Sequence, residues 1–392
     1  MSVNLITAHR ELWKYSRAQG LAGYDPYDGL NSRLFQATPF KNSHAARLAW
    51  TQFHKRSPIN FRSLAGIPRE RNAKAIALFA LAALADFRRE PTRENEIEAR
   101  ELLDDLIWTS LKGFKGASWG YNFDWQSRSF FAPRGTPTIV PTAFAARALC
   151  EAAEVLSRDE YLPFARTICD FILNDLNRSE ETNDEVCFSY SPLDQTRVFN
   201  ASLFAGETLA TVGKLTGEQG LIDWANRAAT YVVRRQGADG SWAYGADSHQ
   251  SWADNFHTAY ILLSLSRINA AVSVPGTGLD FDNALHRGYE FWAERFFLAN
   301  GWPKYFPDRL YPADIHSAAS AIVTLVELRG RISSTLLLAE KIADWANTSL
   351  RDPRGYFYYQ RRRFYRVRIP YMRWAEAWMM YALARLREVT EK

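Results

Sequence analysis

Cysteine is scarce in this chain of 392 residues, which has only Cys150, Cys169 and Cys187. Their number is odd, and no two of them have the C-x-x-C spacing that is typical of thiolate metal sites. The sequence therefore gives no sign of a disulfide framework or of a cysteine-bound metal. We expect the three thiols to be packed in the interior.

Long hydrophobic runs are also lacking. The longest, Ala75 to Ala85, falls well short of the roughly 20 apolar residues that a membrane-spanning helix needs. The first residues become charged at Arg10 and Glu11, which is too early for the apolar stretch of a secretory signal. We therefore expect a cytoplasmic protein with no integral membrane segment.

Nucleotide-binding and nucleic-acid-binding motifs are missing as well. The sequence has no G-x-G-x-x-G or P-loop pattern, and no helix-turn-helix, zinc-finger or RNA-binding sheet signature. The alternation typical of strands appears only locally, as in Phe364 to Ile369, where a short hairpin is expected. We expect no nucleic-acid partner and assign no cofactor.

Aromatic residues, in contrast, are abundant. They make up 14% of the chain, with 13 Trp, 18 Tyr and 24 Phe, which is more than a core of this size needs. Flat aromatic faces are the surfaces against which sugar rings and polyisoprenoids bind. The composition thus favours a ligand of one of these two classes.

The most informative pattern is a repeat of alanine-rich helical segments. Aligned on one residue each, five segments follow one another at spacings of 59, 57, 59 and 58 residues. The aligned residues are Thr142, Ala201, Thr258, Ser317 and Ala375. The segment Asn72 to Phe87 has the same character and makes a sixth.

Amphipathic segments with more charge lie between these repeats. They are Thr92–Leu111, Arg158–Leu176, Gly217–Gln236, Leu279–Leu298 and Ser333–Leu350. Their apolar residues fall on one helical face, so we expect them to lie outside the alanine-rich helices. The remaining outer helix would come from His9–Gln19 or Ser43–Phe53. The pattern predicts an all-α (α/α)6 toroid in which 1–392 is a single domain and 1–65 is an N-terminal arm with the first helices.

Short connectors rich in glycine and aromatic residues join each outer helix to the next inner one. Glycine ends a helix, and the turn that follows leads into the next. All inner helices therefore begin at the same face of the ring. Their first turns and the aromatic connectors should meet at one mouth.

Two histidines stand near the start of neighbouring inner helices. His257 follows Asp254 by three residues, and His316 follows Asp314 by two. The aspartates would serve as helix caps, and a histidine can be a buried structural residue. The repeated arrangement also fits a pair of proton-transfer groups, or a metal site of two His and two Asp, and we assign no metal.

Other polar and aromatic residues should reach the same mouth. Arg373 and Asn200 lie in the first turns of inner helices, and Tyr305 and Tyr311 are close in sequence to His316 and could act as general acid or base. Arg373 ends an arginine-rich stretch from Arg361 that is either a solvated face or an anion site.

Two further groups are candidate site residues. Trp119, Trp242 and Trp302 of the connectors could stack on sugars or could pack between the repeats. Tyr24, Asp25 and Asp28 belong to a turn-rich segment that could be a structural loop or could reach the site.

One motif resembles that of the squalene and hopene cyclases. Gln236-Gly-Ala-Asp-Gly-Ser-Trp242 matches their Q-x-x-x-G-x-W repeat, which stitches helices in a toroid. The D-x-D-D motif of these cyclases is missing, as is the zinc-binding set of protein prenyltransferases. The resemblance thus implies architecture and not terpene chemistry.

A second resemblance covers nearly the whole chain. It rests on segments beginning at Tyr24, Lys55, Trp119, Gly135, Asp254, Asp314 and Ile369. These segments resemble a bacterial family associated with capsule and exopolysaccharide gene clusters. Its members often carry the label delta-aminolevulinic acid dehydratase, but that enzyme is a TIM barrel with a Schiff-base lysine, so we do not follow the label. The resemblance implies a substrate from a bacterial surface polysaccharide.

We therefore expect a carbohydrate-active enzyme that acts on an anionic, uronate-containing oligosaccharide or polysaccharide, by lyase or C5-epimerase chemistry. Arg373 would neutralise the carboxylate, the histidines and tyrosines would exchange the C5 proton, and Trp242 and Trp302 would stack the sugars. Glycoside hydrolysis would instead use Asp254 and Asp314 as its paired carboxylates. The same residues would also suit a non-catalytic glycan-binding or assembly protein of a polysaccharide synthesis complex, or an isoprenoid-handling toroid.

Overall fold

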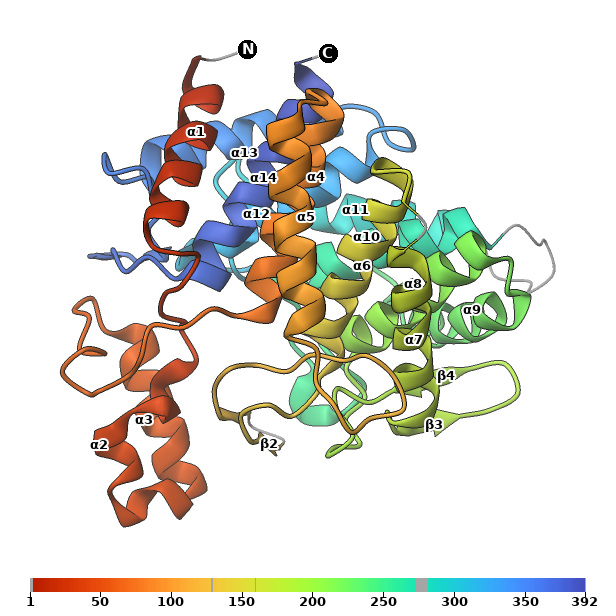
Figure 1. The fold of residues 1–392 in the computed structure, drawn as a ribbon, viewed down its shortest axis with the longest axis horizontal. Helices are drawn as coiled ribbons and strands as arrows, with labels where there is room; N and C mark the ends of the chain where they lie inside the picture. Colours follow the sequence, from red (N-terminus) through yellow and green to blue (C-terminus); the bar gives the residue numbers. More distant parts are fainter. Residues whose placement is uncertain (1–2, 128–129, 159, 273–280, 392) are drawn as a thin grey trace.

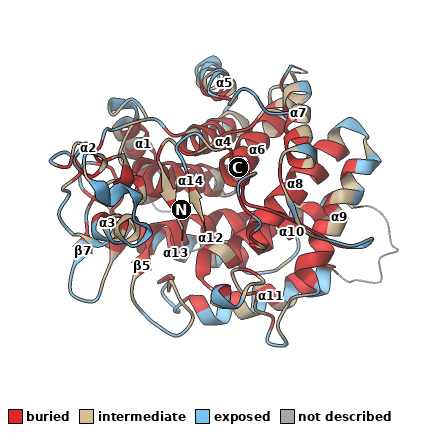
Figure 2. Ribbon diagram, turned by 90° about the horizontal axis from the view of Figure 1, so that it is seen from below, coloured by how far each residue is buried: buried red, intermediate tan, exposed pale blue. Residues whose placement is uncertain are grey.

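Six helices pack side by side in a closed inner ring. The computed structural model describes residues 3–127, 130–158, 160–272 and 281–391. The inner helices are α4 (Ala73–Arg89), α6 (Ile139–Val155), α8 (Phe199–Thr216), α10 (Asn255–Ala271), α12 (Ile315–Leu328) and α14 (Ala377–Thr390). Each contacts the next, and α14 returns to α4, so the ring closes. Figure 2 looks along it and shows these helices as almost entirely buried.

A second set of helices wraps around the first. It consists of α1 (Val3–Ala18), α5 (Arg93–Trp108), α7 (Tyr161–Asn174), α9 (Gln219–Val233), α11 (Phe281–Phe296) and α13 (Thr335–Ser349). The helix that completes this outer layer is α1, which packs against α14 and α13. The predicted (α/α)6 toroid is confirmed. Of the two segments expected to supply the remaining outer helix, the first does so.

The Q-x-x-x-G-x-W motif joins neighbouring hairpins. The Trp242 indole donates a hydrogen bond to the carbonyl of Val232, and the Gln236 amide donates one to Ala284 on α11. A Cβ atom at Gly288 would lie 2.2 Å from the Trp242 ring, so only glycine leaves room for the indole against α11. This packing explains why the motif indicates a toroid whatever its chemistry.

The inner helices all begin at one end of the molecule, at the bottom of Figure 1, and both chain termini lie at the other. Short antiparallel sheets lie at the end where the inner helices begin. They pair β1 (Trp125–Gln126) with β2 (Phe131–Ala132), β3 (Arg178–Glu181) with β4 (Val186–Phe188), and β5 (Ala313–Asp314) with β6 (Gln360–Arg361) and β7 (Arg366–Val367). The β6–β7 pair is the hairpin expected from Phe364 to Ile369. We call this end the mouth and the opposite end the base.

An arm between α1 and α4 lies against the mouth. It contains α2 (Arg33–Gln36) and α3 (His44–Arg56), with 3-10 turns at Asp28–Asn31 and Pro39–Asn42. Figure 1 shows it projecting below the ring on the side of α1. Arg47 of α3 contacts the β1–β2 hairpin through Gln126, and Asp25 pairs with Arg373 next to α14. The arm is thus held on two sides of the mouth.

A chain of ion pairs connects all six inner helices at or beyond their midpoints. In order around the ring its members are Arg147, Glu207, Arg267, Glu327, Arg385, Glu388, Arg88 and Glu151. Burial disfavours ionised glutamate, but attraction to Arg147 and Arg267 outweighs it and lowers the pKa of Glu207 to about 2. The pKa of Glu327 is lowered to about 2 in the same way. We call this set the base ring.

The interior has the thiols expected from the sequence, and Cys150, Cys169 and Cys187 are free and buried. None of the helices that the structure describes combines the length and the apolar character that crossing a bilayer requires.

Candidate active site at the mouth of the ring

The floor of the mouth is built from the same helical position on several inner helices. The residue two places after the N-cap is Lys74 on α4, Asn200 on α8, Phe256 on α10, His316 on α12 and Arg373 in the π-helical turn Met372–Glu376 before α14. All five residues are buried. Because the helices run in the same direction around one axis, equivalent positions face the same way. Asn200, His316 and Arg373 are expected here from the sequence, whereas Lys74 is not.

His257 and Asp254 form a hydrogen-bonded pair at the start of α10. The imidazole Nδ1 lies 2.7 Å from Asp254 Oδ2, while Oδ1 caps the helix by accepting the backbone N–H of His257 at 3.1 Å. The aspartate therefore holds Nδ1–H and leaves the lone pair on Nε2. Within the described residues Nε2 has no hydrogen-bond partner, and the side chain is 21% exposed. A histidine oriented in this way is equipped to act as a general base.

His316 is in a different state. Its Nδ1 donates to the carbonyl of Trp374 at 3.0 Å, and its Nε2 accepts the hydroxyl of Tyr260 at 2.5 Å. Burial holds the pKa of His316 well below its usual value, so the ring is neutral. Both ring nitrogens are occupied, and a metal shared with His257 would have to displace one of these contacts.

Tyr260 is a site residue that sequence reasoning missed. It lies on α10 one turn after His257, and burial raises the pKa of its phenol well above 10. It is therefore a proton donor at neutral pH, with His316 as its acceptor. The sequence could have indicated this role, because Tyr260 follows His257 by three residues and therefore lies on the same face of the helix.

Asp314 caps α12 and is completely buried. It accepts hydrogen bonds from the backbone N–H of His316, the indole of Trp374 and the amide of Gln360. Burial nevertheless outweighs these donors and raises the pKa of Asp314 to about 6. Its oxygens are committed to the protein, so it has a positioning role toward His316 and Trp374 in this arrangement.

Arg373 and Asp25 form a buried bidentate ion pair. Arg373 Nε lies 2.6 Å and Nη2 2.8 Å from the two carboxylate oxygens of Asp25. Asp28 is paired with Arg62 at 2.7 Å, and burial raises the pKa of Asp28 to about 6. The structure therefore brings Asp25 to the mouth, as one interpretation of the turn-rich segment expects. It also shows that the Arg373 charge already has a partner.

The arm adds two residues that are not expected from the sequence. Lys55 Nζ donates to the hydroxyl of Tyr27 at 2.6 Å, and the Tyr27 ring lies 5.4 Å from that of Trp374. Both side chains are partly exposed. Tyr24 contributes mainly its backbone, whose carbonyl accepts the N–H of Met372.

The three connector tryptophans lie in the helical packing. Trp119 and Trp242 are almost fully buried, Trp302 is 8% exposed, and their indole N–H groups donate to backbone carbonyls of Leu106, Val232 and Leu310. Tyr311 lies edge-on against Trp302 at 5.5 Å. Their ring faces are covered, so other aromatics must supply any stacking surface.

Tyr244 and Trp252 offer such a surface. Their rings are parallel, with centroids 4.9 Å apart and an interplanar angle of 12°, and both are partly exposed. The Tyr244 ring also lies 4.6 Å from His257. Tyr305 is partly buried, and its ring centroid lies 5.7 Å from that of Phe256. A sugar held against these rings would lie beside the imidazole.

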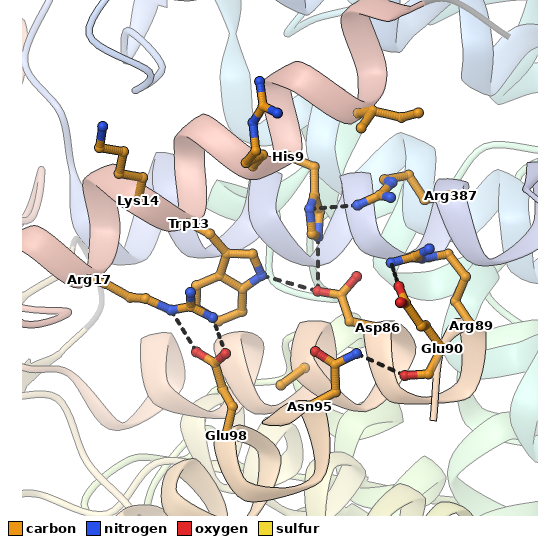
Figure 3. A pocket seen from close by; sticks show the side chains of 13 residues that line it. His9, Trp13, Lys14, Arg17, Asp86, Arg89, Glu90, Asn95, Glu98 and Arg387 are labelled. Atoms are coloured by element: carbon orange, nitrogen blue, oxygen red, sulfur yellow. Dashed lines mark hydrogen bonds and ion pairs between the residues drawn. The ribbon is translucent and has the colours of Figure 1, made fainter. Parts of the chain in front are cut away.

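Two cavities lie outside this floor. One of about 630 Å³ is at the rim of the mouth between Phe130, Thr196 and Asp247. The other, of about 540 Å³, is near the base between α1, α4 and α5 (Figure 3). Several of its charged groups are paired with one another: His9 and Asp86 are 2.9 Å apart, and Arg17 contacts Glu98. Lys14 also lines it and is drawn without a contact (Figure 3).

The fold is shared with several solved structures. Cellobiose 2-epimerase from Bacillus thermoamylovorans superimposes with a TM-score of 0.62 at 16% identity, over 83% of this chain and 90% of that one. An unsaturated glucuronyl hydrolase specific for heparin gives 0.62 at 13% identity, over 99% and 97%. A GH76 α-mannanase from Bacteroides thetaiotaomicron gives 0.58 at 13% identity, over 81% and 86%. No protein-family model matches the chain, and no curated protein is similar to it in sequence.

Proposed function

We propose that the protein is a carbohydrate-active enzyme that removes a proton from a sugar carbon next to a carboxylate, as in uronate lyases and C5-epimerases. The observation that carries this proposal is the His257–Asp254 pair at the mouth. Asp254 fixes the tautomer, so Nε2 can accept the C5 proton, and the imidazolium that forms stays paired with the carboxylate.

A second proton carrier supports the same chemistry. An epimerase must return a proton to the opposite face of the carbon, and a lyase must protonate the leaving oxygen. The Tyr260 hydroxyl, held by His316, is a neutral donor one helical turn away from the base. The rings of His257 and Tyr260 meet edge to face with centroids 6.1 Å apart, so a sugar bound over this pair would contact both groups.

The surroundings support a sugar as the substrate. Tyr244 and Trp252 form a partly exposed aromatic face beside His257. The fold is also that of a cellobiose 2-epimerase and of a glucuronyl hydrolase. The resemblance to a capsule-associated family favours a role in the biosynthesis or modification of a surface polysaccharide, with proteins of its synthesis complex as partners.

Hydrolysis is less well supported by the geometry. Two opposed carboxylates would be needed, with their acceptor oxygens open to the substrate. Asp254 holds His257 and caps α10, and Asp314 is fully buried with three donors on its oxygens. An isoprenoid site would call for an apolar floor, whereas Lys74, His316 and Arg373 make this one polar.

Exchange of hydrogen for deuterium tests the proposal directly. The protein would be incubated in D₂O with uronate oligosaccharides, and C5 deuteration, epimerisation or formation of an unsaturated product followed by NMR. We expect turnover that falls about 10²- to 10⁴-fold in His257→Gln. His286→Gln, at an exposed position on α11, is the matched control and should keep full activity.

The result also separates an enzyme from a binding protein. If the wild-type protein binds uronate oligosaccharides but gives neither exchange nor product, it is a glycan-binding module and the catalytic proposal fails. Equal turnover in His257→Gln and the wild type would exclude His257 as the base.

A further inference from the structure

The positive charges near the floor of the mouth are unequally balanced. Arg373 is paired with Asp25, and Arg147 is paired with Glu207 of the base ring. Lys74, which stands between them, has no carboxylate within ion-pair distance among the described residues. A cation that is buried without an anion is costly for the fold, so this exception calls for an explanation.

The Lys74 side chain lies where several inner helices meet. Its Nζ is 4.3 Å from the ring centroid of Phe144 on α6, 5.3 Å from that of Trp378 on α14 and 5.4 Å from that of Tyr260 on α10. Three helices thus face one amine that comes from a fourth. The aromatic faces attract the ammonium but do not replace the hydrogen bonds that it had in water.

The charged groups around this amine mostly oppose its ionisation. Burial comes first, Arg373 and Arg147 add repulsion, and Asp25 gives a smaller attraction, so the pKa of Lys74 lies well below 10.5. His316 on α12 is neutral and adds no anion, and the Tyr260 phenol is protonated. These surroundings favour a neutral amine, and an arriving anion would restore the ammonium.

Asn200 gives a second, independent indication of a ligand. It occupies the position on α8 equivalent to that of Lys74 on α4, it is buried, and its Oδ1 has no hydrogen-bond partner among the residues that the structure describes. An amide oxygen in this state requires a donor such as a hydroxyl group. The floor is therefore suited to one anion and one hydroxyl, and a sugar acid carries both.

We propose that Lys74 is the residue that binds the carboxylate of a uronate sugar, while Arg373 holds Asp25 and the arm in place. This assignment rests on the proposed function and adds to it the residue that selects an acidic substrate. Neutralising the carboxylate next to C5 also stabilises the carbanion formed when His257 takes the proton. Lys74 then contributes both to binding and to the chemical step.

Calorimetry on the intact protein tests this assignment. Galacturonate disaccharide and its neutral galactose counterpart would be titrated at neutral pH in two buffers of different ionisation enthalpy. We expect the acidic sugar to bind roughly 10- to 100-fold more tightly than the neutral one. Its binding should take up about one proton, because the carboxylate restores the ammonium. Glucuronate-containing disaccharides would be the second probe.

Substitutions at position 74 test whether the preference for the acidic sugar and the proton uptake come from Lys74. Lys74→Met should bind both sugars equally weakly and without proton uptake. Lys74→Arg should keep part of the preference for acid, also without uptake, because guanidinium is always charged. Lys112→Met, at an exposed position, is the control and should behave as the wild type.

Each outcome decides a different point. A preference for acidic sugars that survives unchanged in Lys74→Met overturns the role of Lys74 and leaves the proposed function intact. Should the Met variant fail to fold, equal binding of the acidic and the neutral sugar by the wild type would be enough to overturn it. Absence of any sugar binding by the wild type would instead count against the proposed function itself.

Discussion

The two ends of the inner helices differ in how completely their buried charges are paired. At the base, the base ring links alternating arginines and glutamates across all six helices. Among the described residues at the mouth, Lys74 has no carboxylate partner, the buried Asn200 amide oxygen has no hydrogen-bond partner, and the Nε2 of His257 is free. From this comparison we infer that the paired charges at the base stabilise the fold and that the unpaired polar groups at the mouth are available to bind a ligand.

Buried carboxylates show the same contrast. Guanidinium groups on both sides lower the pKa of Glu207 to about 2, whereas burial raises the pKa of Asp314 to about 6 because neutral donors dominate around it. Glu207 and Asp314 both carry a carboxyl group, and both side chains are buried. Two guanidinium groups outweigh burial at Glu207, whereas at Asp28 the single guanidinium of Arg62 does not, and its pKa is raised to about 6.

Breaking the base ring should have the largest effect on stability. Glu207→Ala leaves Arg147 and Arg267 without their shared anion in the interior. Removing one partner of a buried ion pair typically costs about 3–5 kcal/mol, and we expect a loss of this size in the free energy of unfolding, measured by urea denaturation. A double variant with Arg147→Met should recover part of it. A loss below about 1 kcal/mol would mean that the ring does not carry the stability that its geometry indicates.

Lowering the pH should reduce the difference between wild type and Glu207→Gln. The pKa of Glu207 is lowered on folding from 4.5 to about 2, so its contribution is fully present above pH 4.5 and is lost as the pH falls toward 2. The gap in unfolding free energy between the two proteins should shrink by about 3 kcal/mol over this range. Urea curves at several pH values would show it. A gap that is constant with pH would contradict the lowered pKa.

At the mouth, Asp254→Asn should affect turnover more than stability. Asparagine caps a helix about as well as aspartate, so α10 should be kept. The variant can no longer hold the Nδ1–H tautomer or balance the imidazolium, and we expect kcat on a uronate substrate to fall about a hundredfold, which corresponds to roughly 3 kcal/mol in the barrier. Thermal unfolding and steady-state kinetics on one preparation would show both effects. A large loss of stability with normal kcat per folded molecule would make Asp254 a cap only.

The fold could be predicted because the repeating helical segments can be recognised in the amino-acid sequence. Alanine-rich helices at a spacing near 58 residues and the single Q-x-x-x-G-x-W motif both indicated a toroid, and the comparison structures share that fold. The base ring has an equally regular signal that was missed: Arg147, Glu207, Arg267 and Glu327 follow one another at intervals of 60 residues with alternating sign. That 1–392 forms a single domain stays a prediction.

The site was harder to derive, for physical reasons. Sequence position placed Asp254, His257, Asp314, His316 and Arg373 at one end, and the structure brings them there. It could not say that Arg373 would meet Asp25, 348 residues away, because an arm of irregular structure makes that contact. Lys74 was passed over since its helix looked uniformly apolar, although its place after the N-cap matches that of Arg373.

The smallest effect is expected at an exposed pair on the outer ring. Arg166 and Glu218 lie 2.7 Å apart, closer than several pairs of the base ring, but their side chains are 31% and 40% exposed. Glu218→Gln should change the free energy of unfolding by no more than about 1 kcal/mol, and less at high salt, because water solvates both charges when the pair is broken. Measuring Glu218→Gln and Glu207→Ala under the same urea conditions shows whether the pairing distance or the burial of an ion pair determines its contribution to stability. If both variants lost equal stability, the pairing distance would be the controlling factor, and the contrast between an enclosed ring and a solvated surface would lose its basis.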